Sequence, residues 1–211
     1  MMRNFLTAAF LCVGTGAAAQ SVTIAALGDS LTQGFGLPEA QGFVPQMEDW
    51  LAAQGADVEL INAGVSGDTT QGGLSRVGWT LTPEVDAMIV ALGGNDLLRG
   101  IPPELSRENI EGILRAAEAA EVEVLLVGME APGNYGPDYK AAFDALYPEL
   151  AETYGAVFYP SFFAVFEGQA DVPAELGEYI QADGIHPSAA GVREIVADMG
   201  PAVLELIATV E

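Results

Sequence analysis

Short apolar runs that are typical of β-strands alternate along the chain with segments in which apolar residues recur at helical spacing. The strand-like runs are Val22–Leu27, Val58–Ile61, Ala87–Leu92, Val122–Val127 and Ala156–Tyr159. The segments of helical spacing are Val44–Ala53, Gln71–Val77, Pro103–Ala120, Asp138–Tyr154 and Ala189–Val210. Strands that are separated by helices pair in parallel and are buried on both faces. The pattern therefore predicts an α/β fold with a central parallel sheet of about five strands between two layers of helices.

The length and composition of the chain fit one domain with a sizeable core. The chain has 211 residues, and 50% of them are hydrophobic. A chain of this size buries most of the surface that its unfolded form exposes. No linker, repeat or charge block divides it, so we expect a single domain over residues 20–211.

The first nineteen residues are typical of a secretory signal peptide. Arg3 precedes an apolar run, Phe5–Val13, and small residues follow with Ala17 and Ala19 in an A-x-A arrangement. The run is too short to span a membrane. We expect cleavage after Ala19 and a product located in the periplasm or the medium.

The single cysteine, Cys12, lies inside this segment, so the processed chain would have neither a thiol nor a disulfide. A lipid-modified Cys12 is the alternative. It is disfavoured because the bulky Phe10 and Leu11 precede the cysteine where small residues would be expected. No later apolar run approaches the roughly 20 residues of a spanning helix. We therefore expect a soluble product without stable membrane insertion.

Acidic residues greatly outnumber basic ones. Thirty Asp and Glu against seven Lys and Arg give a formal charge of −23, and loss of Arg3 with the signal peptide makes it −24. This balance excludes nucleic acid as a partner. The acids are dispersed, which fits either a well-solvated surface or adaptation to a saline medium that screens self-repulsion.

The unusual residues gather where the predicted strands end. Gly28-Asp29-Ser30 follows the first run, NAGVSGDTT the second, GGNDLLRG the third and MEAPGNYG the fourth. In open α/β sheets the ligand binds at the carboxyl ends of the strands. These loops therefore predict one functional site at this edge of the sheet.

Ser30 and the only histidine, His186, are the candidates for nucleophile and base. Ser30 alone also fits a tight turn. However, Asp183 stands three residues before His186, in a Gly- and Pro-bounded loop ahead of the last helix. A carboxylate at this spacing can accept the Nδ1 proton and leave Nε2 free to accept a proton.

Other uses of these residues fit the sequence less well. One histidine without a further cysteine would leave a metal site with oxygen ligands only. Neither a Walker A pattern nor a dinucleotide fingerprint is present. We therefore predict that the chain uses neither a metal nor a cofactor.

Three hydrogen-bond donors could stabilise the oxyanion that forms when Ser30 attacks a carbonyl. Ser30 opens a helix or turn, where its own N–H is unpaired. Gly67 offers an N–H that no Cβ shields, and Asn95 offers a side-chain amide at a strand end. Each of the three taken alone also fits an ordinary turn.

Four blocks of the sequence resemble those of the SGNH or GDSL hydrolases, in the branch of thioesterase I, lysophospholipase L1 and arylesterase. The blocks are GDSLTQGFG, NAGVSGDTTQGG, ALGGNDLLRG and DGIHPSAAG, and the resemblance extends from Val22 to about Met199. It implies a flavodoxin-like three-layer αβα sandwich. Gly-Asp-Ser-Leu-Thr is not a G-x-S-x-G elbow, which separates the chain from lipase-type α/β-hydrolases. Thr32 stands where close relatives often carry serine, a change that we expect to be silent.

The resemblance also assigns roles to single residues. It implies that Ser30 is the nucleophile and that Asp183 and His186 complete the catalytic triad. Gly67 and Asn95 would join the Ser30 N–H in the oxyanion hole.

Two segments are candidates for the walls of a substrate groove. The segment MEAPGNYGPDYKAAF resembles the acyl-side loop of the family, and Met129, Pro132 and Tyr135 could line an apolar groove. Leu97 and Leu98, with Ile101, could form the opposite wall. An ordinary surface connection explains the first segment equally well.

The sequence therefore predicts an exported serine esterase that acts on small-molecule carboxylic esters. Neutral aryl, alkyl and lysophospholipid esters are favoured over highly anionic acyl thioesters because the protein is strongly acidic. The alternatives are a carbohydrate O-acetylesterase and, from another class, a binding module without catalysis. A monomer is favoured over an oligomer.

Overall fold

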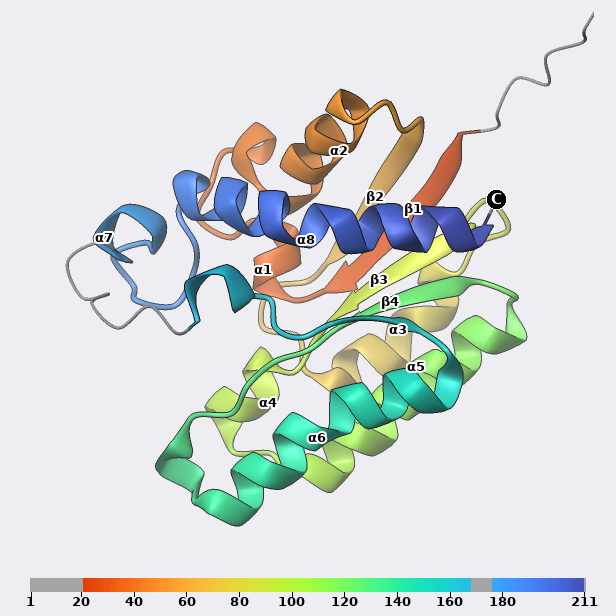
Figure 1. Ribbon diagram of the computed structural model, residues 1–211. Coiled ribbons are helices and arrows are strands. Elements are labelled where there is room, and N and C mark those ends of the chain that lie inside the picture. Colours follow the sequence, from red (N-terminus) through yellow and green to blue (C-terminus); the bar gives the residue numbers. More distant parts are fainter. Residues whose placement is uncertain (1–20, 168–175, 211) are drawn as a thin grey trace, which may run out of the picture.

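The computed structural model describes residues 21–167 and 176–210 (Figure 1). The predicted signal peptide, residues 1–19, lies outside the described residues, and so does Cys12. Within the described ranges, no helix is long and apolar enough to cross a membrane.

Within the described residues, five strands form one parallel sheet. They are β1 (Val22–Gly28), β2 (Val58–Gly64), β3 (Ala87–Ala91), β4 (Glu123–Val127) and β5 (Val157–Tyr159). Their order across the sheet is β2-β1-β3-β4-β5, and every neighbouring pair is parallel. This is the flavodoxin-like order, and it confirms the expected fold class.

Helices cover both faces of the sheet, with α2 and α8 on one face and α3, α5 and α6 on the other (Figure 1). The α-helices are α1 (Ser30–Gln33), α2 (Phe43–Ala53), α3 (Thr70–Thr80), α4 (Gly94–Arg99), α5 (Pro103–Ala119), α6 (Pro137–Tyr154), α7 (Leu176–Tyr179) and α8 (Ala189–Val210). Short 3₁₀ turns are η1 (Glu39–Gln41), η2 (Gly133–Tyr135) and η3 (Ala164–Phe166).

The central strands have no solvent-facing side, which explains why their sequences are continuously apolar. In β1, Ile24 and Ala26 pack toward α2 and α8, whereas Ala25 and Leu27 pack toward α3, α5 and α6. All four side chains are at most 1% exposed. Burial on both faces is the condition that parallel sheets in α/β proteins require.

The connections place the loops after β1 and β3 on the two sides of a crevice. From β1 the chain passes through α1 and α2 to β2 on one side, while β3 pairs with the other side of β1. Gly28 ends β1 opposite both Gly64 of β2 and Ala91 of β3. At such a switch point the outgoing loops diverge and leave room for a ligand. Ser30 follows β1 and Asn95 follows β3, so both residues flank this crevice.

Candidate active site

Ser30 begins α1, two residues after β1 ends. Asp29 caps this short helix, because its Oδ1 accepts a hydrogen bond of 3.0 Å from the Leu31 N–H. A capping carboxylate satisfies a backbone donor that the first helical turn leaves free. The cap thereby fixes the corner at which the Ser30 side chain leaves the sheet.

Asp183 and His186 lie in one loop that precedes α8. Asp183 Oδ1 accepts hydrogen bonds from the backbone N–H groups of Ile185 (2.9 Å) and His186 (3.0 Å). The Gln181 N–H donates to the His186 carbonyl at 2.7 Å, and Ile180 and Pro187 form an antiparallel bridge. The backbone of the loop therefore holds carboxylate and imidazole in one fixed relation.

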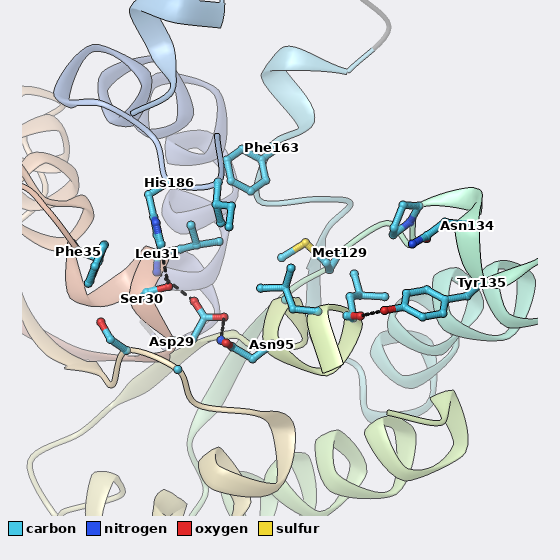
Figure 2. Close-up of a pocket in the computed structure, with 17 residues that line it drawn as sticks. Asp29, Ser30, Leu31, Phe35, Asn95, Met129, Asn134, Tyr135, Phe163 and His186 are labelled. Carbon is cyan, nitrogen blue, oxygen red and sulfur yellow. Dashed lines mark hydrogen bonds between the residues drawn. The ribbon is translucent and has the colours of Figure 1, made fainter. Parts of the chain in front are cut away.

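Ser30, His186 and Asp183 are hydrogen-bonded in series (Figure 2 shows Ser30 and His186). The Ser30 Oγ is 2.8 Å from His186 Nε2, and His186 Nδ1 is 2.7 Å from Asp183 Oδ2. With a carboxylate at Nδ1, the imidazole carries its proton there and accepts one from the serine hydroxyl at Nε2. The arrangement can therefore raise the nucleophilicity of Ser30.

Asp183 is stabilised in its ionised form. The hydrogen bond from the His186 ring, followed by the backbone hydrogen bonds of His186 and Ile185, lowers the pKa of the Asp183 carboxyl from 3.8 to about 2. An acceptor that stays ionised throughout the neutral range keeps the imidazole oriented and stabilises its protonated form.

Three donors at the cavity that Ser30 lines have free hydrogen-bonding capacity. Within the part of the chain that the structure describes, the N–H groups of Ser30 and Gly67 have no acceptor, and Asn95 uses one amide hydrogen only. All three residues line the same cavity. Gly67 has φ of +85°, which a residue with a side chain rarely adopts. The set is chemically suited to stabilise negative charge that develops on a carbonyl oxygen.

Asp29 orients the Asn95 amide as well as capping α1. The Asn95 Nδ2 donates to Asp29 Oδ2 at 3.1 Å (Figure 2). Asp29 is 2% exposed, and this burial raises the pKa of its carboxyl to about 6, although hydrogen bonds from Leu31 and Asn95 oppose the shift. Sequence patterns alone did not reveal this contact between the first and third blocks.

Helix α4 also holds the loop that carries Gly67. Arg99 Nη2 donates to the Gly67 carbonyl at 2.8 Å. Asp96, which is fully buried, accepts from the Thr70 N–H (2.9 Å) and the Thr70 hydroxyl (2.6 Å), and Ser106 donates to it at 3.0 Å. Two of the candidate oxyanion donors are therefore tied to one helix.

A cavity of about 600 Å³ opens beside Ser30. This volume is in the range of small-molecule sites. The predicted groove residues that line it are Leu97, Leu98, Met129, Pro132 and Tyr135. Ile101, which the sequence placed with Leu97 and Leu98, is not among the lining residues, and its carbonyl accepts a hydrogen bond from Tyr139.

The loop with Met129 and Tyr135 is held by hydrogen bonds at both ends. Ala131 donates its N–H to Asp144 at 2.8 Å and accepts a hydrogen bond of 2.9 Å from Lys140. At the other end, the Tyr135 hydroxyl donates to the Leu97 carbonyl at 2.8 Å (Figure 2). Met129, Pro132, Asn134 and Tyr135 of this segment thus form a wall of the cavity that hydrogen bonds hold in place.

Other residues at the cavity were not predicted from the sequence. Phe35, Ser66, Asn134, Phe163 and Ile185 also line it. Phe35 lies inside the GDSLTQGFG block and Ile185 directly precedes His186, so their nearness to the candidate catalytic residues was the available signal. Among the described residues, no group of three His, Cys, Asp or Glu side chains is placed to hold a metal ion.

The comparisons with known proteins agree on the family. The model of the GDSL-like Lipase/Acylhydrolase family matches residues 26–194. Esterase TesA of Pseudomonas aeruginosa is 38% identical over 192 residues, which cover 90% of this chain and 91% of that protein. Thioesterase 1/protease 1/lysophospholipase L1 of Escherichia coli is 34% identical over 180 residues, with 85% of this chain and 82% of the relative covered.

A solved structure extends the similarity to three dimensions. The crystal structure of AlinE4, an SGNH-hydrolase family esterase, matches with a TM-score of 0.72 and 42% identity, and the match covers 90% of this chain and 98% of AlinE4. Sequence blocks, strand order and relatives over most of the chain lead to one assignment. The chain belongs to the GDSL-like lipase/acylhydrolase family and is a serine ester hydrolase.

Proposed function

We propose that this chain hydrolyses aryl, alkyl, lysophospholipid or thio- carboxylic esters through an acyl-enzyme on Ser30, with His186 as base and Asp183 as its orienter. The observation that carries the proposal is the unbroken series of hydrogen bonds from Ser30 through His186 to Asp183 at a largely apolar cavity. A nucleophile, a base and an orienting carboxylate within hydrogen-bonding distance are the parts that covalent acyl transfer requires.

In the first half of the reaction, the Ser30 Oγ attacks the ester carbonyl carbon while its proton passes to His186 Nε2. The carbonyl oxygen becomes an oxyanion and accepts hydrogen bonds from the Ser30 N–H, the Gly67 N–H and the free Asn95 amide hydrogen. The intermediate then collapses. The bond between the carbonyl carbon and the alcohol oxygen breaks, and that oxygen takes the proton from Nε2.

In the second half, water repeats these steps on the acyl-enzyme. His186 Nε2 accepts a proton from the water, whose oxygen attacks the acyl carbon, and the proton returns to Ser30 as the acid leaves. The low pKa of Asp183 supports its role, because an ionised carboxylate stabilises the imidazolium that forms in each half.

The acyl group is expected to occupy the side of the cavity with Leu97, Leu98 and Met129. These apolar side chains support an apolar acyl group, since burying its surface is favourable. The names of the relatives, esterase and thioesterase/lysophospholipase, are compatible with such substrates. A carbohydrate O-acetylesterase would need an open, polar cleft, and an inactive binding module would have no use for the intact series of hydrogen bonds.

Active-site labelling tests the proposal. Ser30→Ala should abolish ester hydrolysis. A fluorophosphonate probe should increase the mass of the wild-type protein by that of one bound probe group, attached at Ser30. Ser66→Ala is the matched control because Ser66 lines the same cavity but donates its hydroxyl to Gln33 at 2.9 Å. It should still be labelled. Labelling that survives Ser30→Ala would disprove the role of Ser30.

A panel of p-nitrophenyl esters from acetyl to palmitoyl separates the candidate functions. The proposed esterase should accept several acyl chains, an O-acetylesterase should prefer acetyl, and a binding module should hydrolyse none. Asp183→Asn should keep the fold and lose several orders of magnitude in kcat, because the imidazole loses its orienter.

We also propose that the chain is exported and cleaved after Ala19. The support is the sequence of residues 1–19, in which a basic start, a short apolar run and an A-x-A site follow one another. N-terminal sequencing of the protein from periplasm and medium should find Gln20 as the first residue. A protein that keeps Met1, or carries lipid on Cys12, would contradict this.

A further inference from the structure

We propose that Phe35 and Ile185 form the binding surface for the leaving alcohol and that they select an aromatic or other flat apolar alcohol. Among the esters proposed above, aryl and alkyl esters would then be better substrates than lysophospholipids, whose alcohol carries a phosphate. The inference rests on the proposed roles of Ser30 and His186, because those roles determine on which side the alcohol departs. It assigns a function to two exposed apolar side chains that the reaction steps above do not use.

The cavity extends to both sides of Ser30. Figure 2 shows Phe35 on one side of Ser30 and His186, and Met129, Asn134 and Tyr135 on the other. During collapse of the intermediate, the alcohol oxygen must receive its proton from His186 Nε2, so it lies next to the imidazole. If the acyl group occupies the side with Met129, the rest of the alcohol extends over Phe35.

Phe35 lies against the imidazole, Ile185 directly precedes His186 and lines the same cavity, and both apolar side chains are unusually exposed. The centre of the Phe35 ring is 4.6 Å from that of His186, with an angle of 35° between the rings. Each of the two apolar side chains is 47% exposed. Exposed apolar side chains that are grouped at the mouth of a cavity are typical of a binding surface.

The backbone holds Phe35 in this exposed position. Gly34 and Gly36 on either side have φ of +85° and +76°, and the Phe35 N–H donates to the Ser30 carbonyl at 3.1 Å. Gln181 donates to the Phe35 carbonyl at 2.8 Å, and a Cβ on Gly36 would lie 2.3 Å from the Gln181 Oε1. The turn is thus fixed to the serine helix and to the histidine loop, so the ring is preorganised for a ligand.

The charges around the cavity disfavour an alcohol that carries phosphate. Among the described residues, the acidic and basic side chains that line the cavity are Asp29 and the candidate base His186, and no lysine or arginine lines it. Arg99 already donates a hydrogen bond to the Gly67 carbonyl. With a formal charge of −23 on the whole chain, a phosphate would be repelled and would find no cation to pair with it.

Esters that share a butyryl group and differ in their alcohol test this inference. For 1-naphthyl butyrate, Phe35→Ala and Ile185→Ala should each lower kcat/KM by roughly tenfold, the size of a lost aromatic or apolar contact. For ethyl butyrate the same variants should stay within about twofold of the wild type, since ethanol is too small to cover the ring. Phe35→Leu should recover part of the loss because it restores apolar area.

Leu98→Ala is the matched control on the acyl side, because Leu98 is also an exposed apolar residue of the cavity, with 63% of its surface accessible. It should change the preference between naphthyl butyrate and naphthyl octanoate without separating naphthyl from ethyl esters. Equal losses of Phe35→Ala on naphthyl and ethyl esters would overturn the inference, since they would mean that the ring only supports His186. Melting curves and fluorophosphonate titration of active sites exclude a misfolded variant.

Ser30→Ala, measured on the same esters, separates a failure of the proposed function from a failure of the leaving-group surface. If Ser30→Ala hydrolyses naphthyl butyrate as fast as the wild type, the proposed function itself fails. If Ser30→Ala is inactive and Phe35→Ala shows no dependence on the alcohol, only the leaving-group surface fails. The leaving-group surface also fails if the ratio of kcat/KM for naphthyl and ethyl butyrate is the same in Phe35→Ala and in the wild type.

Discussion

Asn95 divides the two hydrogens of its amide between the protein and the cavity. One hydrogen is bonded to Asp29 at 3.1 Å, and the other has no partner among the described residues. An amide that is oriented before the substrate arrives costs no reorganisation when charge develops on the carbonyl oxygen. The proposed role of Asn95 therefore concerns the transition state more than substrate binding.

Asn95→Ala should lower kcat by roughly 10² to 10³ and leave KM within a few fold, as is typical when one oxyanion donor is lost. Asn134→Ala is the matched control, because Asn134 lines the same cavity beside Tyr135, away from Ser30 (Figure 2). It should leave kcat nearly unchanged. A raised KM with normal kcat in Asn95→Ala, or a lowered melting temperature with both constants disturbed, would contradict the assignment.

Asp29 should make the free energy of unfolding depend on pH. Burial raises the pKa of its carboxyl from 3.8 to about 6, so the folded protein binds more protons than the unfolded chain between these values. The resulting stabilisation is present below about pH 4 and is lost as the pH rises through about 6. It should amount to about 2 kcal/mol between pH 4 and pH 8.

Urea unfolding of the wild type and of Asp29→Asn at several pH values tests this dependence. The variant removes the titration of residue 29 and leaves the other carboxylates in place, so their contributions cancel in the difference. The wild type should lose about 2 kcal/mol relative to the variant as the pH rises from 4 to 8. If the difference in the free energy of unfolding between the wild type and the variant did not change with pH, the pKa of Asp29 would not be raised in the folded protein.

Helix α4 organises the candidate oxyanion site although it has only six residues. It carries Asn95 itself, and through Asp96 and Arg99 it binds both ends of the segment from Gly67 to Thr70. The Gly67 N–H and the Asn95 amide are thereby positioned by one element. A shift of α4 would move both donors together.

Arg99→Ala should lower kcat by roughly tenfold with little change in KM, because the Gly67 N–H loses its fixed position. Arg99→Lys should recover part of the rate, and guanidinium ions at concentrations too low to unfold the protein should rescue Arg99→Ala. Arg107→Ala is the matched control, since Arg107 is paired with Glu149 between α5 and α6. A loss of the same size in both variants, or no rescue, would mean that Arg99 has no positioning role.

At the level of elements, periodicity predicted most of the fold. All five strands and the five long helices lie where the sequence placed them, because buried parallel strands and amphipathic helices leave strong patterns. Helix α4 could not be predicted, since GGNDLLRG is short, rich in glycine and polar at its start. Its helical form depends on tertiary contacts such as those of the buried Asp96.

The candidate site was predictable only in part. The resemblance pointed to Ser30, Asp183 and His186, and the structure brings their side chains within hydrogen-bonding distance, although their roles stay predictions. Phe35 and Asp29 were missed for a physical reason. An exposed phenylalanine and a buried aspartate acquire meaning only from neighbours distant in sequence, Gln181 and Asn95 respectively.

The charge of the whole molecule acts on substrates before they reach the site. Thirty acids and seven bases produce a negative potential around the chain. Several of the described bases are already paired with acids, among them Arg76 with Asp68 and Lys140 with Asp144. The cavity has no lysine or arginine among its described lining residues, so the site offers nothing that offsets this potential.

We therefore expect the enzyme to discriminate against anionic esters in a way that salt removes. For p-nitrophenyl succinate, whose acyl group ends in a carboxylate, kcat/KM should rise by roughly tenfold between about 10 mM and 1 M NaCl, because the screening length falls from about 30 Å to about 3 Å. For neutral p-nitrophenyl butyrate, kcat/KM should change by less than about twofold over the same range. The neutral ester serves as the control for effects of salt on the protein itself, since it uses the same serine and the same leaving group. Parallel changes for both esters would mean that salt alters the site or the fold. If kcat/KM for the anionic ester did not depend on salt, the potential at the cavity would be set locally by Asp29 and His186 and not by the charge of the whole chain.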